Sequence, residues 1–162
     1  MTATQGLRAR LATSAFFLAV LSPLAAGQEA SLTLTGSSTD YFASAVSGVG
    51  DVDGDGFDDV LVGSYYASGL RGRIEVFSGA TGDRLRVHQG VGAAEQFGQV
   101  VAGVGDVNGD GYPDYAGGAR QASSAGVGAA AGAVRVYSGF NGSLLYAWSG
   151  PSQNDQLGSS LD

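Results

Sequence analysis

Two nine-residue loops rich in carboxylates carry the residues best suited to chemistry in this sequence. Each loop has an oxygen-bearing side chain at positions one, three, five and nine, and a glycine at position six that allows a sharp turn. If the chain curls around a point, these oxygens converge, and the backbone carbonyl of position seven adds a further ligand. The predicted ligands are Asp51, Asp53, Asp55, Phe57 and Asp59 in loop one, and Asp106, Asn108, Asp110, Tyr112 and Asp114 in loop two.

Hard oxygen ligands in this number favour Ca²⁺ as the bound ion. Without a cation the clustered carboxylates repel one another, and a bound dication turns that repulsion into attraction. The alternative is a pair of solvated acidic turns, because Asp-Gly is a common turn former. Two copies in the same register favour the metal site over that alternative.

An EF-hand also uses acidic residues at this spacing, but it needs an acidic residue at position twelve and a helix after the loop. Val62 and Gly117 occupy position twelve here, and the residues that follow each loop are typical of strands. The sequence therefore predicts a calcium loop between two strands.

Both loops lie inside a longer internal repeat. Residues 40–64 are repeated 55 residues later, and residues 72–90 are repeated 60 residues later. The five extra residues fall in the loop 121–131, and a third copy starts at Leu157. A repeat of this length indicates a solenoid, a propeller or an array.

Alternating β-branched and aromatic residues predict four strands in each repeat. The predicted strands are 42–49, 59–65, 72–78 and 84–89 in the first repeat, and 97–104, 114–119, 132–138 and 143–149 in the second. Tandem units of four antiparallel strands indicate an all-β fold of β-propeller blades, with two complete repeats and the start of a third. A sandwich with two similar halves is the alternative, but a sandwich does not need this degree of self-similarity.

The repeats resemble the FG-GAP repeats of integrin alpha subunits. The Phe-Gly pair is Phe97-Gly98 in the second copy, Phe42-Ala43 in the first and Leu157-Gly158 in the third. The Gly-Ala-Pro triplet is degenerate and lacks proline in both complete copies. The resemblance covers roughly residues 31–162, and it implies a calcium-stabilised propeller, usually of seven blades, that binds extracellular partners.

The N-terminus is predicted to be a secretory signal peptide over residues 1–27. Arg8 and Arg10 precede an apolar run over 11–26, and that run is shorter than the ~20 residues that span a bilayer. The predicted location is therefore secreted, extracellular or at the cell surface, or periplasmic in a Gram-negative cell, with no membrane span after cleavage.

The rest of the chain divides into four predicted segments. They are an N-terminal strand and linker over 28–41, repeat one over 42–96, repeat two over 97–156 and the start of repeat three over 157–162. Residues 31–36 resemble the fourth strand of a repeat. This segment is expected either to complete a last blade or to form an edge strand of the first.

Composition excludes several classes of function. Fifteen acidic residues against eight basic ones, none of them lysine, leave no basic surface for nucleic acid. The chain has no cysteine, hence no disulfide and no thiol nucleophile, and its single histidine, His88, has no acid at catalytic spacing. We therefore do not expect an enzyme. Tyr65 and Tyr66 are expected either to pack between blades or to lie exposed on the loop face.

The predicted function is that of a calcium-binding propeller module for adhesion, which binds an extracellular protein or glycan. Two alternatives remain: the propeller segment of a larger secreted enzyme whose catalytic domain lies elsewhere, and a structural unit of an extracellular array. Propellers have roughly four to eight blades. We therefore expect either a truncated reading frame or fragment, whose remaining blades complete the propeller, or blades that assemble with other chains.

Overall fold

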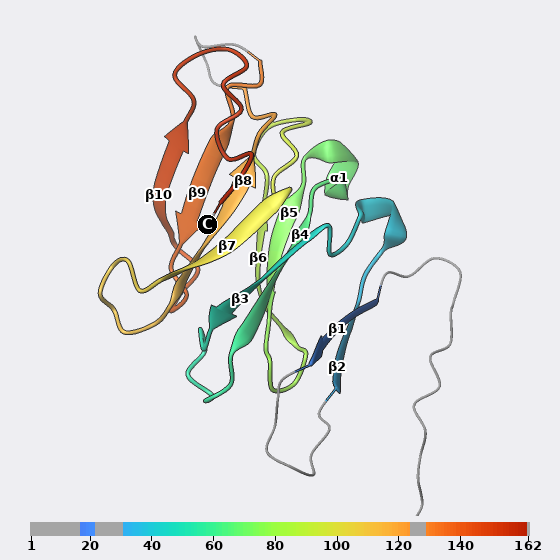
Figure 1. Cartoon of the computed structure of the whole chain (residues 1–162), viewed down its shortest axis with the longest axis vertical. Coiled ribbons are helices and arrows are strands. Elements are labelled where there is room, and N and C mark those ends of the chain that lie inside the picture. The colour runs from blue at the N-terminus through green and yellow to red at the C-terminus, as the bar shows by residue number, and fades with distance from the viewer. Residues whose placement is uncertain (1–16, 22–30, 124–128, 162) are drawn as a thin grey trace, which may run out of the picture.

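The computed structural model describes residues 17–21, 31–123 and 129–161 (Figure 1). Within them the chain forms two four-stranded antiparallel sheets, in the orders β3-β4-β5-β6 and β10-β9-β8-β7. The first sheet contains β3 (Ala45–Gly50), β4 (Asp59–Ser64), β5 (Arg73–Phe77) and β6 (Arg84–Gln89). The second contains β7 (Val100–Gly105), β8 (Asp114–Ala119), β9 (Ala133–Tyr137) and β10 (Leu144–Ser149). The all-β fold of propeller-type blades is therefore confirmed.

A β-bulge precedes each carboxylate loop. The pairing of β3 with β4 shifts between Gly48 and Gly50, and that of β7 with β8 shifts between Gly103 and Gly105. A bulge bends the strand and ends regular pairing. The bulge occurs at equivalent residues in the two repeats, so the strand enters the carboxylate loop in the same way in both hairpins.

The main core lies between the two sheets. Leu61 and Ile74 of the first sheet pack with Phe97, Tyr115 and Tyr137 of the second repeat, all of them buried. Strand β3 lies beside β7, as Figure 1 shows. The two sheets pack as neighbouring blades would, and the larger buried cluster contains residues of both repeats.

Residues before the first repeat form a separate two-stranded sheet. Strand β2 (Ser31–Thr35) pairs antiparallel with β1 (Phe17–Leu21). Leu34 of β2 packs against Phe42 and Val60 on the outer face of the first sheet. The segment 31–36 is thus a strand, as expected, but it covers a face of the first sheet and does not extend that sheet.

Strand β1 falls inside the predicted signal peptide. The other residues of 1–27 lie outside the described part of the structure, so the signal peptide stays a prediction. In the described residues no helix has the length and apolar character needed to cross a membrane.

Two short turns stand at the end of the sheets away from the carboxylate loops. They are η1 (Ser38–Asp40) and α1 (Ala67–Leu70), which contact each other. Inside α1, Ser68 has φ 54° and Gly69 has φ 69°, so this segment is an irregular turn. Neither turn is long enough to leave a helical period in the sequence.

The Phe-Gly motif joins one repeat to the next. Phe97 forms a parallel bridge with Gly72 of the preceding repeat, and its amide donates to the carbonyl of Arg71. The next residue, Gly98, has φ 84°, and a Cβ there would stand 2.2 Å from the carbonyl oxygen of Arg73. The clash excludes a side chain here, and the positive φ also favours glycine. In the first repeat Ala43 takes this position with φ 60°.

We expect Gly98→Ala to destabilise the full chain by at least about 2 kcal/mol, because left-handed strain adds to a backbone clash. Ala43→Gly is the matched control. Glycine at this position relieves the left-handed strain but increases the entropy of the unfolded chain, and these two effects nearly cancel. The free energy of unfolding of this variant should therefore lie within about 0.5 kcal/mol of that of the parent. Urea denaturation measures both free energies of unfolding, and equal effects of the two substitutions would contradict this account.

His88 is part of the contact between the sheets. Its Nε2 lies 2.9 Å from the hydroxyl of Tyr115, and its ring stacks on Tyr137 with centroids 3.8 Å apart. Burial, and next the charge of Arg86, lowers the pKa of His88 to about 4. The only histidine of the chain is therefore a neutral packing residue.

His88 should make stability depend on pH in a definite window. Because its pKa is lower in the folded chain than in the unfolded one, the unfolded state takes up the proton first as the pH falls. Stability should be full above pH 6.5, the ordinary value, and should decrease between pH 6.5 and about 4. Urea midpoints across this range, compared for the parent and His88→Gln, measure the effect. The urea midpoint of His88→Gln should change less with pH than that of the parent. Equal changes in the two proteins would contradict the lowered pKa of His88.

Candidate metal centre

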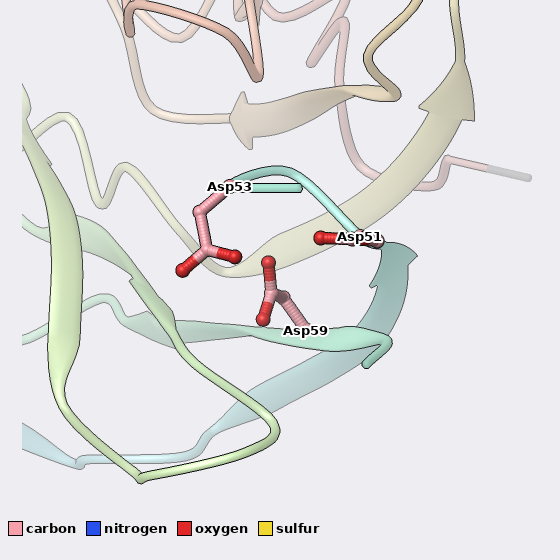
Figure 2. Close-up of side chains that lie close together, drawn as sticks. All are labelled: Asp51, Asp53 and Asp59. Atoms are coloured by element: carbon pink, nitrogen blue, oxygen red, sulfur yellow. The ribbon is translucent and has the colours of Figure 1, made fainter. Parts of the chain in front are cut away.

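Loop one brings three carboxylates together. Asp51 directly follows β3 and Asp59 begins β4, so the hairpin places the two ends of the loop side by side. Asp51, Asp53 and Asp59 each offer a carboxylate oxygen, and these three atoms all lie within 4.8 Å of one another (Figure 2). Two oxygens bound to one Ca²⁺ are at most about 5 Å apart. The cluster therefore fits a calcium ion.

Backbone amides hold Asp51 as an anion. Its Oδ1 accepts from the amides of Gly54 at 2.6 Å and Asp55 at 3.1 Å, and its Oδ2 accepts from Gly56 at 2.8 Å. These hydrogen bonds, that of Gly56 above all, hold the pKa of Asp51 below its usual value. The two glycines have φ 80° and 92°, which explains why this turn uses glycine at positions four and six.

Asp59 is buried at the other end of the loop. Its two oxygens accept from the amides of Val52 and Gly79, each at 2.9 Å. Burial raises the pKa of Asp59 in spite of these two hydrogen bonds. A cation beside this carboxylate would favour its charged form.

Asp55 lies outside the group of three. Its Oδ1 accepts from the amide of Phe57 at 2.8 Å, and its Oδ2 lies 3.5 Å from the hydroxyl of Ser78. Asp55 therefore stays a predicted ligand. The backbone carbonyls of Phe57 and Tyr112 also remain predictions.

Loop two repeats this arrangement. Asp106 accepts from three loop amides and the buried Asp114 accepts from two more distant ones. The donors are Gly109, Asp110 and Gly111 at 2.6, 3.1 and 2.9 Å for Asp106, and Val107 and Gly139 at 2.9 and 3.0 Å for Asp114. The second loop is therefore shaped like the first at the atoms that would face a metal.

The third position differs between the loops. Asn108 replaces the carboxylate of Asp53, and its Nδ2 donates to Asp110 Oδ2 at 2.9 Å. This side-chain hydrogen bond is the main reason why the pKa of Asp110 is lowered. Among the described residues only loop one has three clustered carboxylates. Loop two thus offers a cation one negative charge less.

The two loops touch each other. Gly50 lies against Pro113, where a Cβ would stand 3.0 Å from the ring, and Gly54 lies against Tyr112. Val52, which is 1% exposed, points from loop one into the core between the sheets. Metal binding and blade packing therefore involve adjacent residues of the same loop.

Two glycine amides that hold the buried carboxylates escaped the sequence analysis. Gly79 and Gly139 donate to Asp59 and Asp114 from the turns after β5 and β9. Each of these turns begins with a Ser-Gly pair, at residues 78–79 and 138–139. The recurrence of this pair 60 residues apart is the sequence signal that could have identified the two glycines.

Comparison with known proteins gives consistent matches. Residues 42–83, which include loop one, match the FG-GAP repeat family. The chain is 36% identical to integrin alpha-E of Mus musculus over 124 residues, which are 70% of this chain and 10% of that protein. It is 38% identical to integrin alpha pat-2 of Caenorhabditis briggsae over 95 residues, 53% of this chain and 8% of that protein. The chain thus spans about a tenth of the length of these relatives.

We expect the third loop position to set the relative calcium affinity of the two loops. Loop one should bind Ca²⁺ more tightly than loop two, because it offers one more negative charge. Asp53→Asn should therefore weaken binding in loop one about tenfold, and the reciprocal Asn108→Asp should strengthen binding in loop two by a similar factor. Calorimetric titration of the full chain with Ca²⁺ measures both sites. Unchanged affinities in both variants would show that the carboxylates do not bind the ion.

Proposed function

The chain belongs to the FG-GAP, integrin-alpha-like family, and from that premise we propose that it is a calcium-binding segment of an extracellular adhesion propeller. The observation that supports this most directly is the approach of three carboxylates from Asp51, Asp53 and Asp59 to within 4.8 Å. The repetition of the same hydrogen-bond pattern in loop two adds to it.

Calcium would be held in loop one by Asp51, Asp53 and Asp59 with Asp55, and in loop two by the equivalent oxygens. When bound, the ion supplies positive charge that compensates the clustered carboxylates and links the two ends of each hairpin loop. The chain itself supplies the shape. The amides on Asp51 and Asp59 orient these side chains before any ion arrives.

We propose that the chain acts by binding an extracellular protein or glycan and not by catalysis. FG-GAP repeats of the integrin alpha type are non-catalytic modules. The single histidine, the most versatile acid–base residue, is stacked against Tyr137 in the core. The acidic surface also argues against nucleic acid as a partner.

Further blades are the expected structural partners. Tyr146 and Trp148 of the second repeat and Leu157 at the start of the third are 45%, 51% and 36% exposed. Sixty residues earlier in the chain, the residues aligned with Trp148 and Leu157 are His88 and Phe97, and both pack in the interface between the sheets. We propose that a neighbouring blade covers these exposed side chains in the same way.

Calcium should stabilise the folded chain. At about 10 mM Ca²⁺, a site with a Kd of about 10⁻⁴–10⁻³ M raises the free energy of unfolding by about 1.4–2.7 kcal/mol. Urea denaturation with Ca²⁺ and with a chelator measures the difference. Asp51→Asn should remove part of the gain, whereas Asp83→Asn, in the turn between β5 and β6, is the acidic control. Identical denaturation curves with and without Ca²⁺ would contradict the proposal.

A further inference from the structure

Three tyrosines form an exposed aromatic cluster at the end of the first sheet away from loop one. Tyr41 follows η1, and Tyr65 and Tyr66 follow β4. The ring centroid of Tyr41 lies 5.2 Å from that of each other tyrosine, and the centroids of Tyr65 and Tyr66 are 6.1 Å apart. Tyr41 is 48% exposed and Tyr66 42%. We call these three residues the tyrosine platform.

The fold does not require aromatic residues at these positions. In the second repeat Gln96 aligns with Tyr41 and Arg120 aligns with Tyr65. Tyr41 and Gln96 nevertheless share the same left-handed backbone, with φ 52° and 59°. Because the fold accommodates polar side chains at these positions in the second repeat, blade packing alone does not account for the exposed rings of the first.

The geometry limits what the platform can bind. Rings 5–6 Å apart touch one another, so no cation fits between them as it does in an aromatic cage. A ligand must lie on the outer ring faces. The adjacent Asp40 is paired with Arg73 at 3.3 Å, so the acid next to the platform already has its counter-charge. These features favour an uncharged ligand with a flat apolar face.

The size of the platform favours a sugar over a protein surface. Two tyrosines that are less than half exposed offer on the order of 200 Å². A stable protein interface needs about 800 Å² from each partner. The apolar C–H face of a pyranose ring can stack on one tyrosine, and its hydroxyls can bond to the phenols. Ser37 and Thr39, joined by a 2.6 Å hydrogen bond in the adjoining turn, add exposed hydroxyls.

We propose that the tyrosine platform is a binding site for neutral glycans, which stack on Tyr41 and Tyr66. This inference rests on the proposed binding function and names the ligand class and the residues that contact it. Tyr65 lies against both other rings and positions them.

The test is native electrophoresis of the full chain in gels that contain mixed-linkage β-glucan, xylan, galactomannan or dextran. At least one polysaccharide should retard the chain. Tyr41→Ala and Tyr66→Ala should each raise its apparent Kd about tenfold, as expected for a lost stacking contact. Tyr41→Phe keeps the ring and should change the Kd less than about threefold. Phe140→Ala removes an exposed aromatic ring of the turn between β9 and β10 and should leave the Kd unchanged.

Two results would overturn the proposal: no retardation by any of the four polysaccharides, or equal losses in Phe140→Ala and Tyr66→Ala. Binding to fibrinogen-coated plates that is abolished by Tyr66→Ala, without retardation in the gels, would make the ligand a protein and the glycan assignment wrong. The calcium-dependent gain in stability should persist in every platform variant. If the parent chain shows no calcium-dependent gain in stability, the proposed function is contradicted. The glycan-binding role of the tyrosine platform is tested separately, by the electrophoresis.

Discussion

At the ninth position of each acidic loop a carboxylate is buried, where it accepts hydrogen bonds from two amides far apart in the chain. Asp59 joins Val52, at the start of its loop, to Gly79 in the turn after β5. A buried anion without such partners is costly, so the chain must keep both donors in place. This requirement holds the loop entry, the pair of β4 with β5 and the following turn in one arrangement. Val52 then extends into the core between the sheets. The carboxylate that would bind the metal therefore also positions the contact between blades.

Each repeat also has a group of ion pairs around the same position of its third strand. The residue at that position is a cation in the second repeat, Arg135, and an anion in the first, Glu75. In the second repeat Arg135 of β9 pairs directly with Glu95. In the first repeat the aligned residues are Glu75 and Asp40, so two anions would face each other. Arg73 resolves this conflict, because its guanidinium lies 2.8 Å from Glu75 and 3.3 Å from Asp40. The repeats thus share a backbone while each balances its own charges. Exchanging single residues between the repeats would leave a charge buried without its partner.

The strands and the two loops could be predicted because alternation and repetition are local properties of the sequence. The amides that hold the buried carboxylates could not, since Gly79 lies 20 residues from Asp59 and only the pairing of β4 with β5 brings it near. Asp55 shows the reverse, because it has the expected spacing but bonds to Phe57 and Ser78 outside the cluster. The strand at 31–36 was recognised by its residues, but its partner β1 lies outside the repeat pattern. Spacing predicts which groups are available, and tertiary contacts decide where each one points.

The two ends of a blade are under different physical constraints. At the end where β4 begins, buried carboxylates and left-handed glycines leave little freedom. At loop positions one to six and nine both repeats use the same residues, apart from Asn108 in place of Asp53. At the end where β4 finishes, tyrosines in one repeat align with glutamine and arginine in the other. Tyr41 and Gln96 also share the same left-handed backbone. A change of side chain there alters the exposed surface without disturbing the hydrogen bonds that hold Asp59. A repeat built in this way can vary its exposed surface while the acidic end keeps its shape. Such a separation is needed when one scaffold serves several ligands.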